Sequence, residues 1–255
     1  MNPRAWLVDL DGVVYRGEEP IPGSADFVAW LQQTQQPFLF LTNHSARTPE
    51  SFAQKLQRMG MSVGPEHVLS SAMVTAEFLH RERNGKRIFA MGEEGLLVAL
   101  RHRTVEVVED DPDIVVVALD RRLSYERLTK TCRLIMGGAE FIATNGDVTY
   151  PLQDGPAPEC GALLASMEAV TGRKPLLMGK PERHMYEEAL RRLGVEREQA
   201  VMVGDRLDTD IGGAKRLGIR SILVLSGQTT RPQAENSETQ PDLICNDLKA
   251  CMARA

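Results

Sequence analysis

The sequence predicts an α/β protein: a Rossmann-like, doubly wound parallel sheet with a smaller α/β domain inserted into it. Short apolar runs typical of buried strands alternate with amphipathic helical segments, as in βαβ units. The pattern changes near Asn84-Gly85 and resumes its first form after Gly179, which indicates an insertion into a split core. Several strands are followed directly by polar residues, at the position where open α/β sheets bind their ligands.

Residues 1–84 form the first part of the predicted core. Proline marks two boundaries in it, because Pro37 precedes a strand and Pro49 takes the first position of a helix behind the capping residue Thr48. The expected elements are a strand at 5–8, a helix at 24–35, a strand at 38–41, a helix from 48, a strand at 68–69 and a helix from 71.

Residues 85–178 carry enough elements for a small α/β domain, and residues 179–255 return to the core. In the insertion we expect strands at 87–91, 114–118 and 141–143, helices at 93–101 and 125–136, and a Gly/Pro-rich loop at 146–158. In the returning core we expect helices at 182–193 and from 209, strands at 200–203 and 221–225, and a polar surface loop at 229–240.

The composition is that of an ordinary globular protein, with 42% hydrophobic and 25% charged residues among 255. The net charge of −5 disfavours a nucleic-acid or anionic-membrane partner, which would need a basic surface. No apolar stretch is long enough to span a bilayer, and the N-terminus does not resemble a signal peptide, so we expect a cytoplasmic protein. The four cysteines form no Cys-x-x-Cys pair and are expected to be reduced.

The most informative stretch is Asp9-Leu10-Asp11-Gly12-Val13, directly after the first predicted strand. Two carboxylates that close a hydrophobic strand must be desolvated, paired or bound to a metal. Asp9 and Asp11 are therefore candidates for a metal and phosphoryl site.

Three further motifs occupy similar positions. Thr42-Asn43 follows the strand at 38–41 and offers a hydroxyl and backbone N–H groups to a phosphate. Gly179-Lys180-Pro181 precedes a helix and offers a fixed cation, and Gly204–Asp210 follows the strand at 200–203 with three more acids. Each motif alone is more typical of a turn or a solvated loop. Because a parallel sheet gathers its strand ends at one edge, together they suit Mg²⁺-assisted phosphoryl transfer.

These motifs, in this order, resemble the haloacid dehalogenase (HAD) superfamily, and in particular its NagD-like and 4-nitrophenylphosphatase-like members with a large C2-type cap. The resemblance covers nearly the whole chain and extends to the segment Ile142–Asp147 of the insertion. It implies a catalytic core at 1–84 and 179–255 and a cap at 85–178. It also implies a Mg²⁺-dependent phosphatase that hydrolyses small phosphomonoesters through an aspartyl-phosphate intermediate.

The resemblance implies two catalytic acids. Asp9 would be the nucleophile that attacks phosphorus. Asp11 would protonate the leaving alcohol and then activate water for hydrolysis. To act as an acid near neutrality, Asp11 would need a raised pKa, which neighbouring aspartates can supply.

It also implies how the phosphoryl group and the metal are held. Thr42 and the Asn43 backbone would hold the phosphoryl group, and Lys180 would offset the charge of both the nucleophile and the phosphate. Mg²⁺ would be bound by Asp9, the main-chain carbonyl of Asp11 and Asp205, while Asp210 would act mainly on the waters of the metal. Asp208 matches no catalytic position, so we expect it at the surface or as a helix cap.

Two departures from the family pattern bear on specificity. His44 stands where many relatives have a second asparagine, and it is either a substrate or phosphate contact or a polar loop residue. Pro158-Glu159-Cys160-Gly161 stands where a glycine- and alanine-rich turn is commoner. Cys160 fits a small packing residue better than a reactive thiol, since nothing nearby marks it for thiolate formation.

The expected partner is a small phosphorylated metabolite that fits beneath the cap, such as a sugar phosphate or a nucleotide, and two subunits could pair through an exposed cap edge. Two other functions remain open: a non-catalytic sensor of phosphate ligands on the same fold, and a phosphotransferase or mutase. The sensor would bind without turnover, and the transferase would deliver phosphate to a second acceptor rather than to water.

Overall fold

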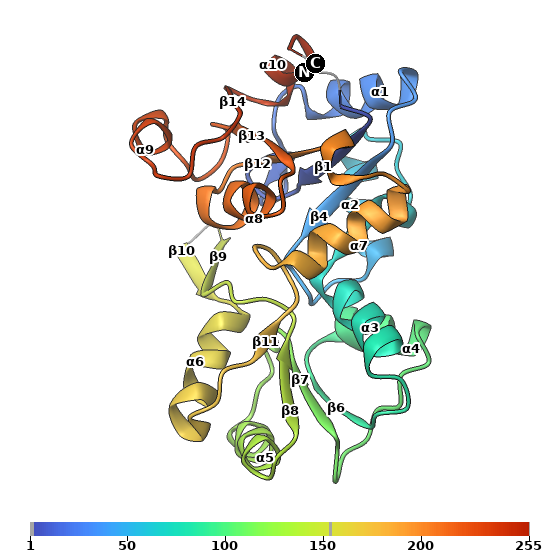
Figure 1. Cartoon of the computed structure of the whole chain (residues 1–255), viewed down its shortest axis with the longest axis vertical. Helices are drawn as coiled ribbons and strands as arrows, with labels where there is room; N and C mark the ends of the chain where they lie inside the picture. The colour runs from blue at the N-terminus through green and yellow to red at the C-terminus, as the bar shows by residue number, and fades with distance from the viewer. Residues whose placement is uncertain (1–2, 153–154, 255) are drawn as a thin grey trace. The chain divides into compact units, whose positions relative to one another are not determined.

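The computed structural model describes residues 3–152 and 155–254, which form two compact units (Figure 1). The core unit comprises the described residues of Met1–Thr42, Glu50–Leu69 and Lys180–Ala255, and the inserted unit comprises Asn43–Pro49 and Ser70–Gly179.

The predicted domain boundary at 84/85 differs from this division. Helix α3 (Ser71–Glu82), which was expected in the core, packs against α4 (Glu94–His102) of the inserted unit. The segment 43–49 also belongs to the inserted unit, because Ala46 accepts a hydrogen bond from the backbone of Gly95 at 3.1 Å and Ser45 accepts one from the backbone of Leu119 at 3.3 Å.

The core unit is built on a six-stranded sheet with strand order β14-β13-β12-β1-β4-β5, and the strand pairs on both sides of β1 are parallel. The chain moves outward from β1 to β4 and β5, and later returns on the other side as β12, β13 and β14. The order therefore reverses between β1 and β12, which is where doubly wound sheets form ligand sites. The strands are β1 (Ala5–Asp9), β4 (Phe38–Thr42), β5 (Val68–Ser70), β12 (Ala200–Gly204), β13 (Arg220–Val224) and β14 (Leu243–Cys245).

Side chains on both faces of this sheet are buried. One face carries Trp6 and Val8 and packs on Phe27 of α1 and Phe52 of α2, and the indole of Trp6 meets Phe27 edge-on at 5.3 Å. The opposite face is covered by α7, which packs against β4, and by α8, which packs against β13. The core helices are α1 (Ser24–Gln33), α2 (Pro49–Arg58), α7 (Arg183–Leu193), α8 (Gly212–Arg216), α9 (Arg231–Glu235) and α10 (Leu248–Met252).

The inserted unit contains its own four-stranded sheet of order β11-β8-β7-β6, in which neighbouring strands are parallel. Phe89, Val115 and Phe141 of this sheet pack with Ile135 of α5 and Leu164 of α6 in a second hydrophobic core. The remaining elements are β6 (Ile88–Met91), β7 (Ile114–Val117), α5 (Tyr125–Met136), β8 (Glu140–Ala143), α6 (Cys160–Thr171) and β11 (Leu176–Leu177).

The prediction of an α/β fold with a doubly wound parallel sheet is confirmed, but two predicted loops are wrong. The segment predicted as a loop at 146–158 contains the antiparallel strands β9 (Thr149–Leu152) and β10 (Gly155–Pro158), while Gln153 and Asp154 lie outside the described residues. The surface loop predicted at 229–240 contains α9, which begins behind a capping box at Thr230.

The twelve-residue helix α6 was not predicted. Several short elements were also not predicted, since they carry too few residues for a periodic pattern. They are β2 (Tyr15–Arg16), β3 (Glu19–Pro20), β11, β14, α10 and the 3₁₀ turns Pro65–His67 and Arg197–Gln199. The helix predicted from 209 begins later, at Gly212 of α8, because residues 207–211 form a π-helical turn, η3 (Leu207–Ile211). Among the described residues, no helix has the length and apolar character needed to cross a bilayer.

Candidate active site

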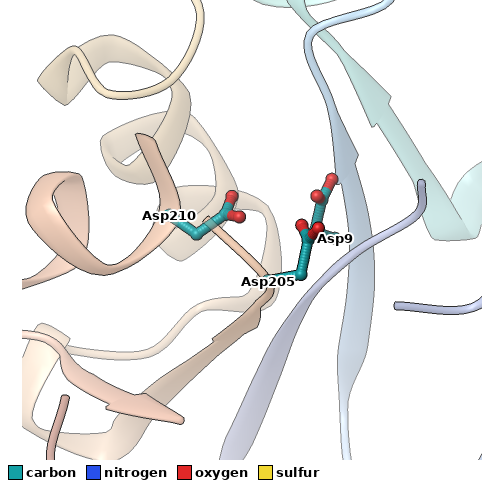
Figure 2. Close-up of side chains that lie close together, drawn as sticks. All are labelled: Asp9, Asp205 and Asp210. Atoms are coloured by element: carbon teal, nitrogen blue, oxygen red, sulfur yellow. The ribbon is translucent and has the colours of Figure 1, made fainter. Parts of the chain in front are cut away.

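Three aspartates meet at the carboxyl edge of the core sheet (Figure 2). Asp9 is the last residue of β1, Asp205 directly follows β12, and Asp210 lies in η3. All three are buried, and one carboxylate oxygen from each lies within 4.8 Å of the others. The strand reversal between β1 and β12 therefore brings together acids that are separated by almost 200 residues in sequence.

Lys180 supplies a positive charge to this cluster. It is 4% exposed, and its Nζ donates hydrogen bonds to Asp9 Oδ1 at 2.6 Å and to Asp210 Oδ1 at 2.8 Å. A third contact, to the carbonyl of Leu41 at 3.5 Å, ties the ammonium group to the end of β4. Burial by itself would lower the pKa of Lys180, but Asp210 and Asp9 outweigh that effect and raise the pKa above its ordinary value.

The cluster would carry an excess of negative charge with all three acids ionised. Burial raises the pKa of Asp9 well above its ordinary value, and the charges of Asp210 and Asp205 raise it further against the pull of Lys180. Burial and Asp210 likewise raise the pKa of Asp205 to about 7. Three buried carboxylates face one buried ammonium group, so the ionised cluster needs a further positive charge.

One carboxylate oxygen of Asp205 is placed to bind such a positive charge. Its Oδ2 accepts a hydrogen bond from the backbone of Gln228 at 2.7 Å, whereas its Oδ1 is buried and has no hydrogen-bond partner among the described residues. A buried acceptor without a partner is costly unless an ion or water satisfies it. Carboxylate oxygens are the ligands that hard divalent cations prefer, so the donor set fits Mg²⁺.

The segment after β13, which sequence reasoning missed, positions Asp205. A side chain at Gly227 would overlap the Asp205 carboxylate, so only glycine lets this backbone approach. Ser226 supports the same region by donating a hydrogen bond from Oγ to the carbonyl of Gly12 at 2.8 Å. Glycine at 227 was not distinguishable from an ordinary turn glycine, because its contact with Asp205 appears only once the sheet is formed.

We expect Gly227→Ala to weaken metal binding roughly 10–100-fold, because the added methyl group displaces the Asp205 carboxylate. Calorimetric titration of the protein with Mg²⁺ measures this effect. Gln228→Ala is the matched control, since the bond to Asp205 comes from the backbone of residue 228 and the substitution keeps it. An unchanged affinity for Mg²⁺ in Gly227→Ala would contradict the assigned contact.

Tyr186 was also missed. Its hydroxyl, at the buried face of α7, donates toward the carbonyls of Thr209 at 2.8 Å and Asp210 at 3.1 Å, and so fixes the η3 turn. Asp210 Oδ2 in turn accepts a hydrogen bond from the backbone of Arg206 at 3.1 Å. The tyrosine could not be singled out in the sequence, because its position in an amphipathic helix predicts only a core residue.

Asp11 lies in the loop that follows β1, and Thr42 is the last residue of β4. The Asp11 carboxylate is partly exposed and accepts a hydrogen bond from the Tyr15 hydroxyl at 3.4 Å, while Gly12 between them has the left-handed φ of 82° that the tight turn requires. Thr42 is 3% exposed and follows Leu41, which pairs with Asp9 across the two strands. Their catalytic roles stay predictions.

Asn43 and His44 belong to the inserted unit. The Asn43 side chain donates to Asp147 Oδ2 at 2.8 Å, and its carbonyl accepts hydrogen bonds from Ser71 at 2.6 Å and Asn145 at 2.8 Å. The His44 ring lies nearly parallel to that of Tyr150, with centroids 6.2 Å apart. Whether His44 contacts a substrate stays open.

The surroundings of Asp208 and Cys160 fit structural rather than catalytic roles. Asp208 lies at the surface and forms an ion pair with Arg206 at 2.8 Å. Cys160 is buried beside Thr144, and burial is the largest of the effects that raise the pKa of its thiol, which makes it an unreactive packing residue. All four cysteines are buried and free of disulfide bonds.

Family models and curated relatives match most of this chain. Residues 6–106 match the haloacid dehalogenase-like hydrolase model and residues 177–251 match a HAD-hydrolase-like model. The acid sugar phosphatase of Staphylococcus saprophyticus is 38% identical over 97% of this chain and 96% of its own. The 5'-nucleotidase YutF of Bacillus subtilis is 35% identical over 96% of both chains.

Solved structures give the same result. The p-nitrophenyl phosphatase of Archaeoglobus fulgidus superposes with a TM-score of 0.95 at 32% identity over 100% of both chains, and NagD of Escherichia coli with 0.92 at 32% over 98% of both. The glycerol phosphate phosphatase Rv1692 of Mycobacterium tuberculosis, in complex with magnesium, gives 0.91 at 32% identity over 98% of this chain and 76% of its own. Similarity along its entire length to phosphatases of this fold establishes that the chain is a phosphatase of the haloacid dehalogenase-like hydrolase family, within the NagD-like group.

Proposed function

We propose that this protein hydrolyses small phosphomonoesters with Mg²⁺ as cofactor, through a phosphoryl group carried briefly by Asp9. The observation that carries the proposal is the charge imbalance of the buried cluster. Among the described residues, Asp9, Asp205 and Asp210 surround one buried ammonium group, that of Lys180, and Asp205 Oδ1 has no hydrogen-bond partner. Such a site favours a divalent cation and a phosphoryl group whose charge develops during reaction.

Asp9 is the proposed nucleophile. One of its oxygens attacks the phosphorus atom, the bond from phosphorus to the ester oxygen breaks, and the phosphoryl group is transferred to the carboxylate. Lys180, at 2.6 Å from Asp9, lowers the repulsion between the carboxylate and the incoming phosphate. Thr42 and the Asn43 backbone would hold the phosphoryl oxygens during this transfer.

Asp11 is the proposed proton donor and acceptor. It delivers its proton to the leaving alcohol in the first step, and in the second it takes a proton from water, which attacks phosphorus and frees Asp9 and inorganic phosphate. Its position two residues after the nucleophile, in a turn held by the bond from Gly12 N–H to the carbonyl of Tyr15 at 2.8 Å, supports this assignment.

Asp9, Asp205 and the main-chain carbonyl of Asp11 would hold the metal, with Asp210 beside them. Bound there, Mg²⁺ would supply positive charge that favours the ionised carboxylates and attracts phosphoryl oxygens. The fit rests on the oxygen donors and on the unpartnered Asp205 Oδ1. The magnesium complex of the mycobacterial relative supports the choice of metal.

The proposed substrates are sugar phosphates, nucleoside monophosphates and similar small metabolites. The relatives include an acid sugar phosphatase, a 5'-nucleotidase and a glycerol phosphate phosphatase, which supports this class. The residues that select among them are expected in the inserted unit, around 144–147 and 156–161. Pairing of two copies through exposed residues of the inserted unit stays a prediction.

Metal removal tests the proposal. We expect EDTA to reduce turnover of p-nitrophenyl phosphate at least about 100-fold, since the carboxylate cluster then lacks the charge it needs, and added Mg²⁺ to restore it. Mg²⁺ is also expected to raise the melting temperature by binding the folded state alone. Activity that persists undiminished in EDTA contradicts the proposal.

The products separate the alternatives. A hydrolase releases one free phosphate for each alcohol formed, whereas a phosphotransferase delivers phosphate to a second alcohol. A sensor binds phosphorylated metabolites without releasing phosphate from any member of a broad panel. Stoichiometric phosphate release from sugar phosphates or nucleotides would support hydrolysis against both.

A further inference from the structure

Glu159 is a buried acid that no step of the proposed reaction uses. It lies at the N-terminus of α6 and is 4% exposed, and its Oε2 accepts a hydrogen bond from the backbone of Cys160. Its Oε1 is buried and, within the described part of the chain, lacks a hydrogen bond. A carboxyl group in such surroundings is costly, which calls for a compensating role.

The loop formed by residues 144–148 is seated directly on this helix end. The backbone of Gly161 donates to the carbonyl of Asp147 at 2.8 Å, and the backbone of Glu159 donates to the carbonyl of Val148 at 2.9 Å. A side chain at Gly161 would collide with the carbonyl of Gly146, so helix and loop touch backbone to backbone. A shift at Glu159 is therefore transmitted to the loop.

The same loop holds Asn43. Asp147 accepts the hydrogen bond from the Asn43 side chain, and Asn145 donates to the Asn43 carbonyl, both at 2.8 Å. The two loop residues are also joined to each other, because the backbone of Asp147 donates to Asn145 Oδ1 at 2.9 Å. Asn43 is thus fixed at both its carbonyl and its side chain by residues that lie against Glu159.

We propose that Glu159 is a positioning residue for phosphate binding, and that its buried carboxyl group acts through Asn145 and Asp147 to fix the orientation of Asn43. This inference rests on the proposed function, in which the Asn43 backbone holds the phosphoryl group. Glu159 itself touches neither substrate nor metal in this scheme.

The protonation state of Glu159 gives this role a measurable signature. Burial is the main cause that raises the pKa of Glu159 to about 8. The Cys160 N–H opposes this rise, the charge of Asp147 adds to the rise, and a hydrogen bond with Asn145 opposes it. Near neutrality the group is therefore largely uncharged beside Asp147. When it ionises, the buried carboxylate of Glu159 lies beside the half-buried carboxylate of Asp147, and we expect Asp147 to release Asn43.

Among residues 3–152 and 155–254, few other ionisable groups face Glu159. The loop contributes Asp147, and α6 contributes the Cys160 thiol, whose raised pKa keeps it neutral. β9 carries Tyr150, whose hydroxyl interacts with Arg121, and β10 has no ionisable side chain. Cys132 of α5 packs in the hydrophobic core, and burial raises the pKa of its thiol, which is therefore uncharged.

The test compares Glu159→Gln and Glu159→Ala with the intact protein, using p-nitrophenyl phosphate from about pH 6.5 to about pH 9. We expect the KM of the intact protein to rise about fivefold to tenfold across the upper half of this range, and the KM of Glu159→Gln to stay nearly flat there. Glu159→Ala is expected to raise KM about tenfold already at pH 7, with kcat changed less than about threefold. Glu168→Gln, the same change on the same helix, should keep the profile of the intact protein.

Two results would overturn the inference: KM profiles that coincide for the intact protein and Glu159→Gln, or an unchanged KM in a folded Glu159→Ala. If Glu159→Ala fails to fold, the glutamine variant still decides. Calorimetric binding of inorganic phosphate, measured in parallel, should weaken in the same order as KM rises. An intact protein that binds phosphate but hydrolyses no ester would refute the proposed function instead, and phosphate binding by the variants would still test Glu159.

Discussion

Asp9→Asn is expected to lower turnover of p-nitrophenyl phosphate by at least about 1,000-fold, because an amide oxygen is a poor nucleophile and carries no charge to direct at phosphorus. The substitution keeps the size of the side chain and an oxygen that can accept the hydrogen bond from Lys180. Steady-state kinetics at saturating Mg²⁺ measure the loss.

The same substitution should leave the fold as stable as before or more stable. The pKa of Asp9 in the folded protein lies above its ordinary value of 3.8, chiefly through burial. An acid whose pKa rises on folding contributes stability at low pH that is lost as the pH rises through the folded pKa. A neutral amide avoids this loss, so in EDTA we expect the melting temperature at neutral pH to be unchanged or higher.

Asp208→Asn is the matched control, because Asp208 belongs to the same Asp205–Asp210 motif but lies at the surface, paired with Arg206. We expect its activity to stay within about twofold of the unmodified protein, since an exposed ion pair contributes little. Asp9→Asn with a tenth or more of the original activity would contradict the assignment of the nucleophile.

The architecture of the core could be predicted because its strands are buried on both faces. Runs such as Phe38–Leu41 and Ala200–Val203 are continuously apolar, and each ends in a glycine or polar residue. That pattern indicates parallel strands, and parallel strands place their ends at one edge. The sequence therefore predicts that Asp9, Asp205 and Lys180 lie together at this edge of the sheet.

The parts that escaped prediction depend on contacts between distant segments. The β9–β10 hairpin is rich in proline, and its pairing depends on cross-strand partners rather than on local pattern. Gly227 and Tyr186 are ordinary residues in sequence, and they matter because the fold brings them to Asp205 and Asp210. The assignment of α3 to the inserted unit likewise follows from its packing on α4.

Lys180→Met is expected to cost about 3–5 kcal/mol of unfolding free energy in the absence of metal, because breaking a buried ion pair leaves uncompensated charge. Lys180 contacts Asp9 at 2.6 Å and Asp210 at 2.8 Å, and all three side chains are buried. The pKa of Lys180 lies above its ordinary value of 10.5, so its contribution to stability is fully present below that pH. Denaturant titration in EDTA measures the loss, and phosphatase activity should fall at least about 100-fold.

The pH dependence of this loss separates electrostatics from packing. With Lys180 removed, the carboxylates repel one another when ionised, so the deficit in stability should be largest above about pH 7, the pKa of Asp205, and should shrink as the acids protonate at lower pH. Mg²⁺ should restore part of the stability, because it supplies the missing positive charge. Lys215→Met, which removes a half-exposed ion pair to Asp242, should cost less than about 1 kcal/mol. A deficit independent of both pH and Mg²⁺ would mean that Lys180 stabilises the core by packing alone. That result would contradict the charge balance on which the proposed metal site depends.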